Sequence, residues 1–439
     1  MTSNPRHILI ASPIAPPSPL SGARRVAGLT KFLALRGHEV SVLTSTISGT
    51  GPVPGATRTI RTRDLMAGGL NWRKANLAAL SGATPSTYNA EPSMVSSFLV
   101  PDVGIVSWVP FAISRARELA REGRPIDCVI TSSPPHSTQV IGMALQRSGI
   151  PWIADLRDGW HPEGSRPHPR PSIVEHAYQM LERRIVRGAD LVTAVTSPIA
   201  KDLARRTGVN AVVVTNGYDP CEFPARDSCG GSDLLTDHRI SLVYTGRLAA
   251  EDRDLEWITD GLEVLLAEDP AVADRFEIVF AGPLTAREVR EIELRSPLLR
   301  HVGNLDRREV LELQRAADGL LLVIGDGRPS IATGKLYEYL ATDLPILVLG
   351  EGNEASAIVH EAGVGSSCST TPTSVAKALA SIVSGGLVRS NDRRRVLKYG
   401  YDYIAREMAD AVEAAICSAD IHDMSANPLT DRRRPLVSP

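Results

Sequence analysis

Short apolar runs of strand length alternate with longer amphipathic runs along almost the whole chain. This alternation indicates an α/β protein with parallel sheets, because two parallel strands need a long crossover, usually a helix, between them. In the first half the strand-length runs are residues 7–12, 39–45, 128–133, 151–156, 191–196 and 212–217. The helical patterns between them are residues 23–37, 109–123, 137–149 and 171–188. The first half therefore predicts one doubly wound sheet.

The second half repeats this style after a break. Residues 218–237 are rich in Pro, Gly, Asp and Ser and show no hydrophobic period, so we expect an interdomain linker at 219–237. The chain has 439 residues, enough for two domains, which are expected at 1–218 and 238–396. The later strand-length runs are residues 240–246, 277–282, 299–304, 320–326 and 345–350. The sequence thus predicts two Rossmann-like sheets that face each other across a cleft.

The C-terminal end carries one more amphipathic run, residues 397–417, which we expect to pack back on the first domain. Residues 418–439 are predicted to be a disordered tail. The DRRRP segment of this tail places three arginines beside Asp431, which allows at most a weak peripheral contact with an anionic membrane. No run approaches the roughly 18 apolar residues of a membrane span, and the start lacks the pattern of a secretory leader. A cytoplasmic protein is expected.

Composition excludes several classes of protein. The 48 basic and 50 acidic side chains give a formal net charge of −2, so the chain lacks the positive field of a nucleic-acid-binding protein. The five cysteines share no CxxC spacing, which argues for free thiols and against a disulfide framework or a zinc site. Neither HxxxH nor HExxH spacing occurs, and the sequence predicts no catalytic metal.

Ligands of open α/β sheets bind beyond the carboxyl ends of the strands, so the residues that follow strands matter most. The segment 327–347, GRPSIATGKLYEYLATDLPIL, follows such a run. A helix is predicted to begin near Thr333 and Gly334, where free N–H groups and the charge of Lys335 suit a phosphate. Glu338 lies on the same face and can accept hydrogen bonds from a ribose diol. Alternatively, Thr333 only caps the helix while Lys335 and Glu338 form a solvated pair.

Two further segments of the second half point to a nucleotide. Gly246 and Arg247 directly follow a strand, a place from which a guanidinium can hold a diphosphate bidentately; the alternative is a salt bridge to Glu251 or Asp252. Asn304 and Leu305 form a turn whose backbone can read a nucleobase edge, ahead of a helix that Asp306 is expected to cap.

In the first half, Gly22 opens the first helix and permits close approach of a phosphate or sugar, although no GxGxxG pattern supports a dinucleotide site. The alternative is an ordinary loop between strand and helix. His136 starts a helix and can orient or relay a proton for a sugar hydroxyl, unless it is structural. The end of the strand at 151–156 is dense in charge, which favours an acceptor-lining loop, with an internal Asp–Arg lock as the rival interpretation. The residues of this loop are Asp155, Arg157, Asp158 and Trp160.

Taken in order, these segments resemble the family 4 glycosyltransferases of the GT-B fold, over about residues 5–417. The resemblance rests on PPSPLSG, RGHEVSVLTS, SSPPHS, ADLRDGW and TNGYD in the first half, and on YTGRL, FAGP, HVGNLDRREV and ATGKLYEYLATDLPIL in the second. It implies a nucleoside diphosphate-sugar donor as co-substrate, held mostly by the second domain, and an acceptor held mostly by the first. It also implies transfer with retention at the anomeric carbon and without a metal. The GKLYEYLA form is similar to that of bacterial enzymes of polysaccharide or antibiotic-type secondary-metabolite assembly.

The resemblance also implies roles for single residues. Arg247 matches the arginine that binds the diphosphate, and Thr333 and Gly334 match the helix start under the phosphates. Glu338 matches the second, ribose-binding Glu of the E-x7-E motif, and His136 falls near a residue that lines the sugar pocket. Arg247, Lys335 and His136 are the expected catalytic residues. The full set expected at the donor is Gly22, Gly246, Arg247, Asn304, Leu305, Asp326, Ser330, Thr333, Gly334, Lys335 and Glu338.

Two positions depart from the family pattern. The first Glu of E-x7-E is replaced by Ser330, so its task passes to Asp326 or is dropped. The phosphate-binding Lys expected five residues after Arg247 is replaced by Asp252, and Lys335 or Arg253 must supply the charge, with Lys335 preferred because an ammonium near a helix N-terminus calls for an anion.

Two other functions stay open. A nucleotide-sugar epimerase can share the two-domain fold, but no cluster of acidic and basic groups that would take a proton from the sugar is evident beside the second-domain motifs. Loss of the first Glu and of the usual Lys would also suit a non-catalytic homologue that binds a nucleotide sugar. The nucleotide, the sugar, the acceptor and the oligomeric state are not specified by the sequence.

Overall fold

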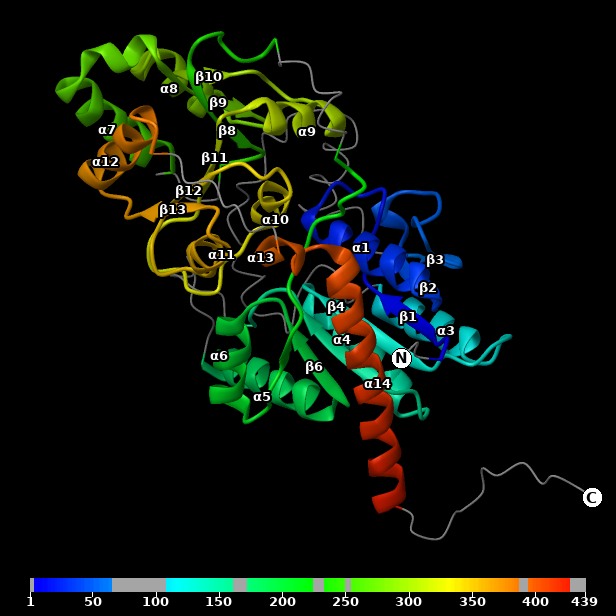
Figure 1. Ribbon diagram of the computed structural model, residues 1–439. Coiled ribbons are helices and arrows are strands. Elements are labelled where there is room, and N and C mark those ends of the chain that lie inside the picture. The colour runs from blue at the N-terminus through cyan, green and yellow to red at the C-terminus, as the bar shows by residue number, and fades with distance from the viewer. Residues whose placement is uncertain are drawn as a thin grey trace, which may run out of the picture.

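A computed structural model describes residues 4–64, 108–160, 172–223, 233–248, 254–386 and 394–426. Figure 1 shows two lobes, each built around a sheet, with the elements of residues 240–383 in the upper lobe. The first sheet has seven strands in the order β3-β2-β1-β4-β5-β6-β7, and the second has six in the order β10-β9-β8-β11-β12-β13. All pairings between these strands are parallel, so the expected pair of doubly wound sheets is confirmed.

The N-terminal sheet and its helices take up residues 7–213. Its strands are β1 His7–Ala11, β2 Glu39–Ser45, β3 Arg58–Thr62, β4 Cys128–Ser133, β5 Trp152–Leu156, β6 Leu191–Ala194 and β7 Val212–Val213. Its helices are α1 Ser21–Leu35, α3 Val109–Leu119, α4 Gln139–Gln146, α5 Ser172–Gly188 and α6 Ser197–Thr207, with the short 3-10 helix η3 at His136–Thr138.

The C-terminal sheet takes up residues 240–368. Its strands are β8 Ile240–Thr245, β9 Phe276–Ala281, β10 Leu299–His301, β11 Gly319–Val323, β12 Ile346–Leu349 and β13 Gly365–Cys368. The helices of this lobe are α7 Asp254–Glu268, α8 Ala286–Arg295, α9 Arg307–Ala316, α10 Gly334–Leu340, α11 Glu354–Ala362 and α12 Pro372–Val383, followed by α13 Arg394–Leu397 and α14 Tyr401–Ala426.

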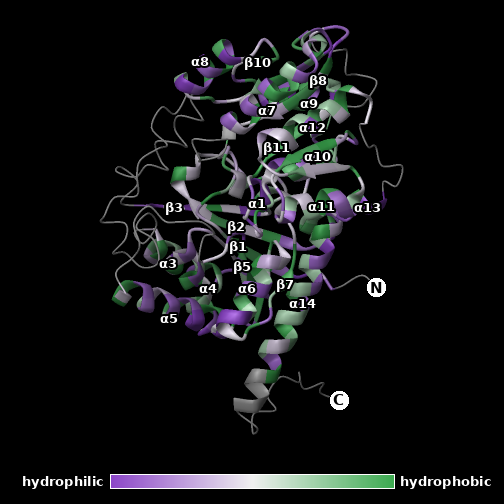
Figure 2. Cartoon of the chain, turned by 90° about the vertical axis from the view of Figure 1, so that its left-hand side faces the viewer, coloured by the Kyte–Doolittle hydropathy of each residue, from purple (hydrophilic) through white to green (hydrophobic). Residues whose placement is uncertain are grey.

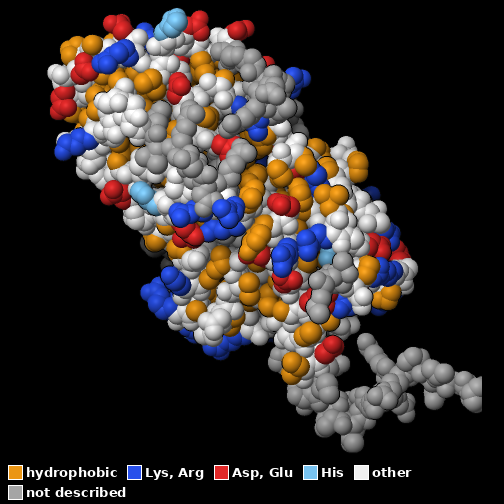
Figure 3. Space-filling view, viewed as in Figure 1, with side chains coloured by type: hydrophobic (Ala, Val, Ile, Leu, Met, Phe, Trp, Pro, Cys, Tyr) orange, Lys and Arg blue, Asp and Glu red, His pale blue; other side chains and the backbone are white. Residues whose placement is uncertain are grey.

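The central strands read as continuous apolar runs because helices cover both faces of a parallel sheet. Every residue of β1, β9 and β11 is buried. Figure 2 shows this apolar interior flanked by helices with polar outer faces, α5 among them. On the face drawn in Figure 3, acidic and basic side chains are interspersed, in keeping with the small net charge.

The chain crosses between the lobes twice, and the two crossings pair with each other. The Tyr218 amide donates to the Tyr399 carbonyl at 3.0 Å, and the Tyr401 amide donates to the Tyr218 carbonyl at 2.9 Å. Helix α14 then packs on the N-terminal sheet, where Ile404 and Met408 join the same core cluster as Ile8 and Ile10 of β1. The expected return of the C-terminal helix to the first domain is therefore observed.

The helix is longer than expected. The tail prediction from residue 418 is wrong at its start, because α14 continues to Ala426; residues 427–439 lie outside the described part of the chain. The linker expected at 219–237 is described only at 219–223 and 233–237. The domain limits otherwise stay a prediction.

The strand orders locate the site. In each sheet the order reverses beside the first strand, between β1 and β4 in one lobe and between β8 and β11 in the other. Ligands of doubly wound sheets bind at such switch points, beyond the carboxyl ends of the strands. The segments that follow these four strands begin at Ser12, Pro134, Gly246 and Ile324.

Candidate active site

Glycines let the strand ends of the C-terminal sheet come close together. Gly246, with φ of +101°, follows β8, and Gly282, with φ of +130°, follows β9. A Cβ atom on Gly282 would lie 2.8 Å from the Cα atom of Gly246, so these two loops touch backbone to backbone. The Gly282 amide also donates to the Gly303 carbonyl at 2.8 Å, which brings in the loop that carries Asn304. The loops that follow β8, β9 and β10 thus contact one another and form one surface at the strand ends.

Lys335 and Arg247 are 88 residues apart in the sequence and come into contact at this surface. The Lys335 ammonium donates to the Arg247 carbonyl at 2.7 Å and to the Tyr244 hydroxyl. It also lies 4.1 Å from the centre of the Tyr244 ring, a favourable place for a cation. Helix α10 therefore presents its first turn, and a positive charge, to the end of β8.

Helix α10 begins where the sequence predicts. Thr333 is its N-cap residue with extended backbone angles, and Gly334 is its first helical residue. The Thr333 hydroxyl makes no side-chain cap and, within the described ranges, is buried without a hydrogen-bond partner. The alternative in which Thr333 serves as a side-chain cap is therefore not observed.

Glu338 is buried between the lobes and bound by arginines from both. Its side chain is 7% exposed, and one carboxylate oxygen accepts from the Arg307 guanidinium of α9 at 2.9 Å. The other oxygen forms an ion pair with Arg24 of α1. A solvated pair between Glu338 and Lys335, the second part of that alternative, is also not observed. Neither Arg24 nor Arg307 is expected at the site from the sequence alone. The double arginine of SGARRV and the Arg after Asp306 were the only signals for them.

Asp326, which was expected at the donor, is instead hydrogen-bonded to residues of two neighbouring loops. Its carboxylate accepts from the Glu351 amide at 2.8 Å and from the amide and hydroxyl of Thr370 at 3.0 and 2.8 Å. Burial alone would raise the pKa of Asp326, but these hydrogen bonds hold it below the usual value. Asp326 therefore ties the loops after β12 and β13 together. Ser330 instead lies at the lobe interface, where its carbonyl accepts from the Thr196 hydroxyl at 3.3 Å.

The remaining donor-side candidates lie at the start of α9. Asn304 is exposed, and Leu305 is half-buried against the core cluster that contains Leu336. Asp306 caps α9 as expected, in a capping box with Glu309. Asp252 and Arg253 lie outside the described residues.

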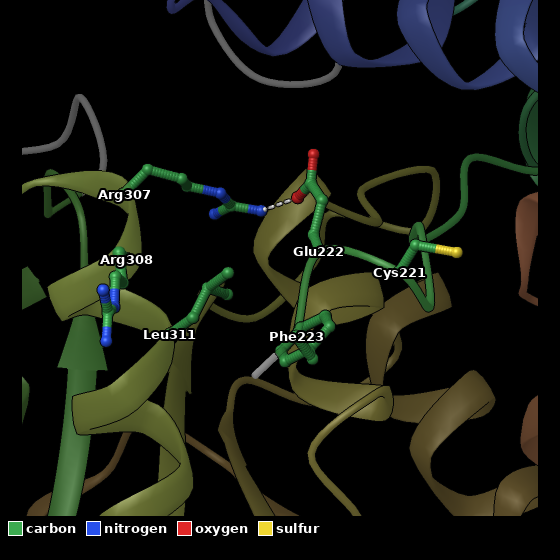
Figure 4. Close-up of a pocket in the computed structure, with 6 residues that line it drawn as sticks. All are labelled: Cys221, Glu222, Phe223, Arg307, Arg308 and Leu311. Carbon is green, nitrogen blue, oxygen red and sulfur yellow. Dashed lines mark hydrogen bonds and ion pairs between the residues drawn. The ribbon is translucent and has the colours of Figure 1, made fainter. Parts of the chain in front are cut away.

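A pocket of about 470 Å³ lies beside the start of α9, between that helix and the segment Cys221–Phe223. Figure 4 shows Arg307 and Glu222 pointing toward each other across it, joined by a hydrogen bond of 2.5 Å. Arg307 therefore links the buried Glu338 to the wall of this pocket. The pocket is lined by Cys221, Glu222, Phe223, Arg307, Arg308 and Leu311.

On the N-terminal side, the assignment of Asp155 to the acceptor is corrected. Asp155 is fully buried, and its carboxylate accepts from the Arg25 guanidinium at 2.6 and 2.9 Å. The hydroxyls of Ser132 and Thr193 donate to it at 2.7 and 2.8 Å. The internal Asp–Arg lock is the correct interpretation, and its partner is Arg25 of α1.

Trp160 likewise belongs to the hydrophobic core and does not line an acceptor site. It is 1% exposed and packs between His136, at 4.4 Å between ring centres, and Tyr178, at 5.1 Å. His136, at the start of η3, is itself 7% exposed, so its ring is held against the core. This stacking gives His136 the fixed orientation that the sequence could not supply.

Arg157 and Asp158 do reach the strand end. Arg157 is half-buried and donates from Nε to the Ser133 carbonyl at 3.3 Å and from Nη2 to the Pro134 carbonyl; Asp158 is exposed. A Cβ atom on Gly22 would overlap with the Arg157 guanidinium. In this structure Gly22 thus admits a protein side chain, where the sequence predicted room for a ligand.

The described residues contain no group of three or more His, Cys, Asp or Glu side chains that could hold a metal ion. None of the helices in the described ranges is long and apolar enough to cross a membrane. Four of the five cysteines, Cys128, Cys221, Cys368 and Cys417, are free thiols, and Cys229 lies outside the described residues.

The two facing sheets and the strand-end site define a protein of the GT-B fold, and solved structures agree over nearly the whole chain. Sucrose-phosphate synthase from Thermosynechococcus elongatus is 18% identical, with a TM-score of 0.64 over 94% of this chain and 100% of that one. HepE from Anabaena, in complex with UDP and glucose, is 14% identical, with a TM-score of 0.58 over 92% and 99%. AviGT4, a glycosyltransferase involved in avilamycin A biosynthesis, is 16% identical, with a TM-score of 0.53 over 94% and 98%.

Within this fold, residues 22–218 match the model of the glycosyl transferase 4-like domain. The comparison with curated proteins found no match. The resemblance to family 4 glycosyltransferases seen in the sequence is confirmed over these residues.

Proposed function

We propose that this protein is a retaining glycosyltransferase that moves a sugar, for example a hexose, from a nucleoside diphosphate-sugar to an acceptor. The observation that carries the proposal is the meeting of Arg247 and the first turn of α10 at the switch point of the C-terminal sheet. There the Lys335 ammonium touches the Arg247 carbonyl, and Glu338 lies one turn further along. A positively charged helix start followed by a carboxylate is the arrangement that a diphosphate and its ribose need.

The donor would lie along α10. Its diphosphate would contact Arg247, Lys335 and the backbone of Thr333 and Gly334, and its ribose hydroxyls would donate to Glu338. The loop of Gly303, Asn304 and Leu305 would face the nucleobase. Departure of the nucleoside diphosphate builds negative charge on its phosphates, and the two cations stabilise that charge more in the transition state than in the ground state.

The acceptor would bind on the N-terminal side of the interface, beside His136, Arg157 and Asp158. Its hydroxyl would attack on the face that the leaving group vacates, and its proton would pass to a phosphate oxygen. The likeness to a glycosyltransferase of avilamycin A biosynthesis supports an acceptor of secondary-metabolite assembly, and an acceptor of polysaccharide assembly is the other class that the GKLYEYLA segment suggests. We propose a cytoplasmic enzyme in which no metal ion takes part in the transfer.

Thermal-shift titration with UDP, GDP, ADP and dTDP tests the donor site. One of them is expected to stabilise the protein, by about 2.7 kcal/mol at a hundred times its dissociation constant. In Lys335→Ala the melting temperature without ligand is the reference, because Lys335 also holds the Arg247 loop. The ligand-induced shift should collapse there, since the phosphates lose a charged donor.

Lys377→Ala is the matched control, because Lys377 is an exposed lysine of α12 in the same lobe. It should leave the shift unchanged. If no nucleotide stabilises the protein, or if the shift survives in Lys335→Ala, the donor site is not where we place it. A protein that binds a nucleotide sugar and scrambles the sugar without an acceptor would be an epimerase instead.

A further inference from the structure

A chain of alternating charges crosses the interface between the lobes. Arg24, in the first turn of α1, forms an ion pair with Glu338 of α10. Arg307 donates to the other oxygen of Glu338 at 2.9 Å and to Glu222 at 2.5 Å. Two guanidinium groups thus share one buried carboxylate, and one of them comes from the opposite domain.

This sharing conflicts with the ribose site of the proposed function. Each carboxylate oxygen of Glu338 is already paired with one arginine, so a ribose hydroxyl that reaches the same side of an oxygen competes with that arginine for it. Arg307 is also held by its hydrogen bond to Glu222. Arg24 has no other hydrogen bond or ion pair among residues 4–64, 108–160, 172–223, 233–248, 254–386 and 394–426, and its side chain is 46% exposed. Arg24 is therefore the arginine that can move.

The donor also offers Arg24 a new partner. The position where the resemblance calls for the phosphate-binding lysine is Asp252. Lys335, the substitute favoured by the sequence, has two of its three ammonium donors engaged by the Tyr244 hydroxyl and the Arg247 carbonyl, so a diphosphate would gain from a further cation. When ribose hydroxyls occupy Glu338, the guanidinium of Arg24 is left unpaired beside a diphosphate, and a charge-assisted hydrogen bond to phosphate is the strongest contact within its reach.

We propose that Arg24 exchanges partners: it holds Glu338 in the donor-free protein and turns to the donor diphosphate when the ribose takes Glu338. The inference rests on the proposed function. It makes Arg24 a donor-binding residue supplied by the acceptor-side domain. The same side chain ties the lobes together before binding and contacts the bound donor afterwards, so donor occupancy and the lobe interface are coupled through it.

Calorimetric titration with two ligands separates the two partners of Arg24. The ligands are the nucleoside diphosphate that stabilises the wild-type protein and the matching nucleoside, which has the ribose but no phosphates. In Arg24→Ala the diphosphate should bind about tenfold or more weakly, because it loses a charge-assisted contact. The nucleoside should bind about threefold or more tightly, because its ribose no longer competes with Arg24 for Glu338. Effects of opposite sign are not expected from a residue that only supports the fold.

Two further variants control the result. Arg205→Ala removes an arginine of the same domain whose side chain is 78% exposed and pairs with Asp202, and it should change neither affinity. In the Glu338→Gln background, where no carboxylate holds Arg24, the gain in nucleoside affinity on adding Arg24→Ala should vanish. Melting curves without ligand confirm that each variant is folded.

The outcomes separate this inference from the proposed function. If the diphosphate binds and depends on Lys335 while Arg24→Ala changes neither ligand, or weakens both alike, the exchange is wrong and the donor site stands. If no nucleoside diphosphate binds the wild-type protein, the proposed function fails and the exchange falls with it.

Discussion

Asp155→Asn is expected to destabilise the N-terminal domain by about 3–5 kcal/mol, because it leaves the buried guanidinium of Arg25 without its counter-charge. Asp155 is 0% and Arg25 1% exposed, and the carboxylate accepts four hydrogen bonds from Arg25, Ser132 and Thr193. Urea unfolding followed by tryptophan fluorescence measures the loss, since Trp108, Trp152 and Trp160 are buried in this domain.

The pH dependence of stability should change with it. Burial would raise the pKa of Asp155, but the charge of Arg25 and the hydrogen bonds to the carboxylate hold it below its usual value. Such a group stabilises the fold above its unfolded-state pKa of about 4, and the stabilisation is lost as the pH falls toward the folded-state pKa. The wild-type domain should therefore lose stability below about pH 4, and Asp155→Asn should lack this contribution.

Two comparisons make the result specific. The exposed Arg205→Ala should cost less than about 1 kcal/mol. Replacing both members of the lock, in Arg25→Met with Asp155→Leu, should restore much of the stability lost in Asp155→Asn, because no buried charge is left unpaired. A loss below about 1 kcal/mol in Asp155→Asn would show that the lock is not formed in solution.

Arg247→Ala is expected to lower kcat/KM for the nucleoside diphosphate-sugar by about 100-fold, because the leaving diphosphate loses a bidentate donor as its charge builds up. The kcat/KM of Arg247→Lys should lie between those of the wild-type protein and Arg247→Ala, since lysine keeps the charge but not the planar pair of donors. Initial rates of nucleoside diphosphate release at several donor concentrations give these values.

Arg275→Ala is the control for Arg247, because Arg275 is an exposed arginine of the same lobe that pairs with Asp269. It should leave kcat/KM within about twofold of wild type, as exposed ion pairs contribute little. Unchanged activity in Arg247→Ala would remove Arg247 from the donor site and contradict the role that its place after β8 suggests.

Most strands and helices of the fold could be predicted from local pattern, because parallel strands that are covered on both faces are nearly continuous apolar runs. The predicted strands at 39–45 and 128–133 match β2 and β4 residue for residue. Strands β3 and β13 were not predicted: Arg58–Thr62 and Gly365–Cys368 lie at sheet edges and have few or no aliphatic residues. Helix α14 was ended too early because the polar composition after residue 416 looked like a tail.

The candidate site was harder to predict, because its decisive contacts join residues far apart in sequence. The density of charge at the end of β5 pointed to Asp155 and allowed an internal Asp–Arg lock, but only the fold shows that its partner is Arg25 of α1. Trp160 seemed accessible in a charged loop, yet it stacks on His136 in the core. Lys335 was preferred as the substitute for the missing phosphate-binding lysine, but its contact with Arg247 appears only in the fold. No local sequence pattern indicated that Arg24 and Arg307 both pair with Glu338.

The most direct test of the central claim is proton NMR of the sugar released when the protein is incubated with an α-linked nucleoside diphosphate-sugar and no acceptor, so that water takes the acceptor's place. A retaining transferase should release the α anomer first, at a rate that falls about 100-fold in Arg247→Ala. Initial release of the β anomer, scrambling of a ring carbon other than the anomeric one, or a rate that ignores Arg247 would contradict it.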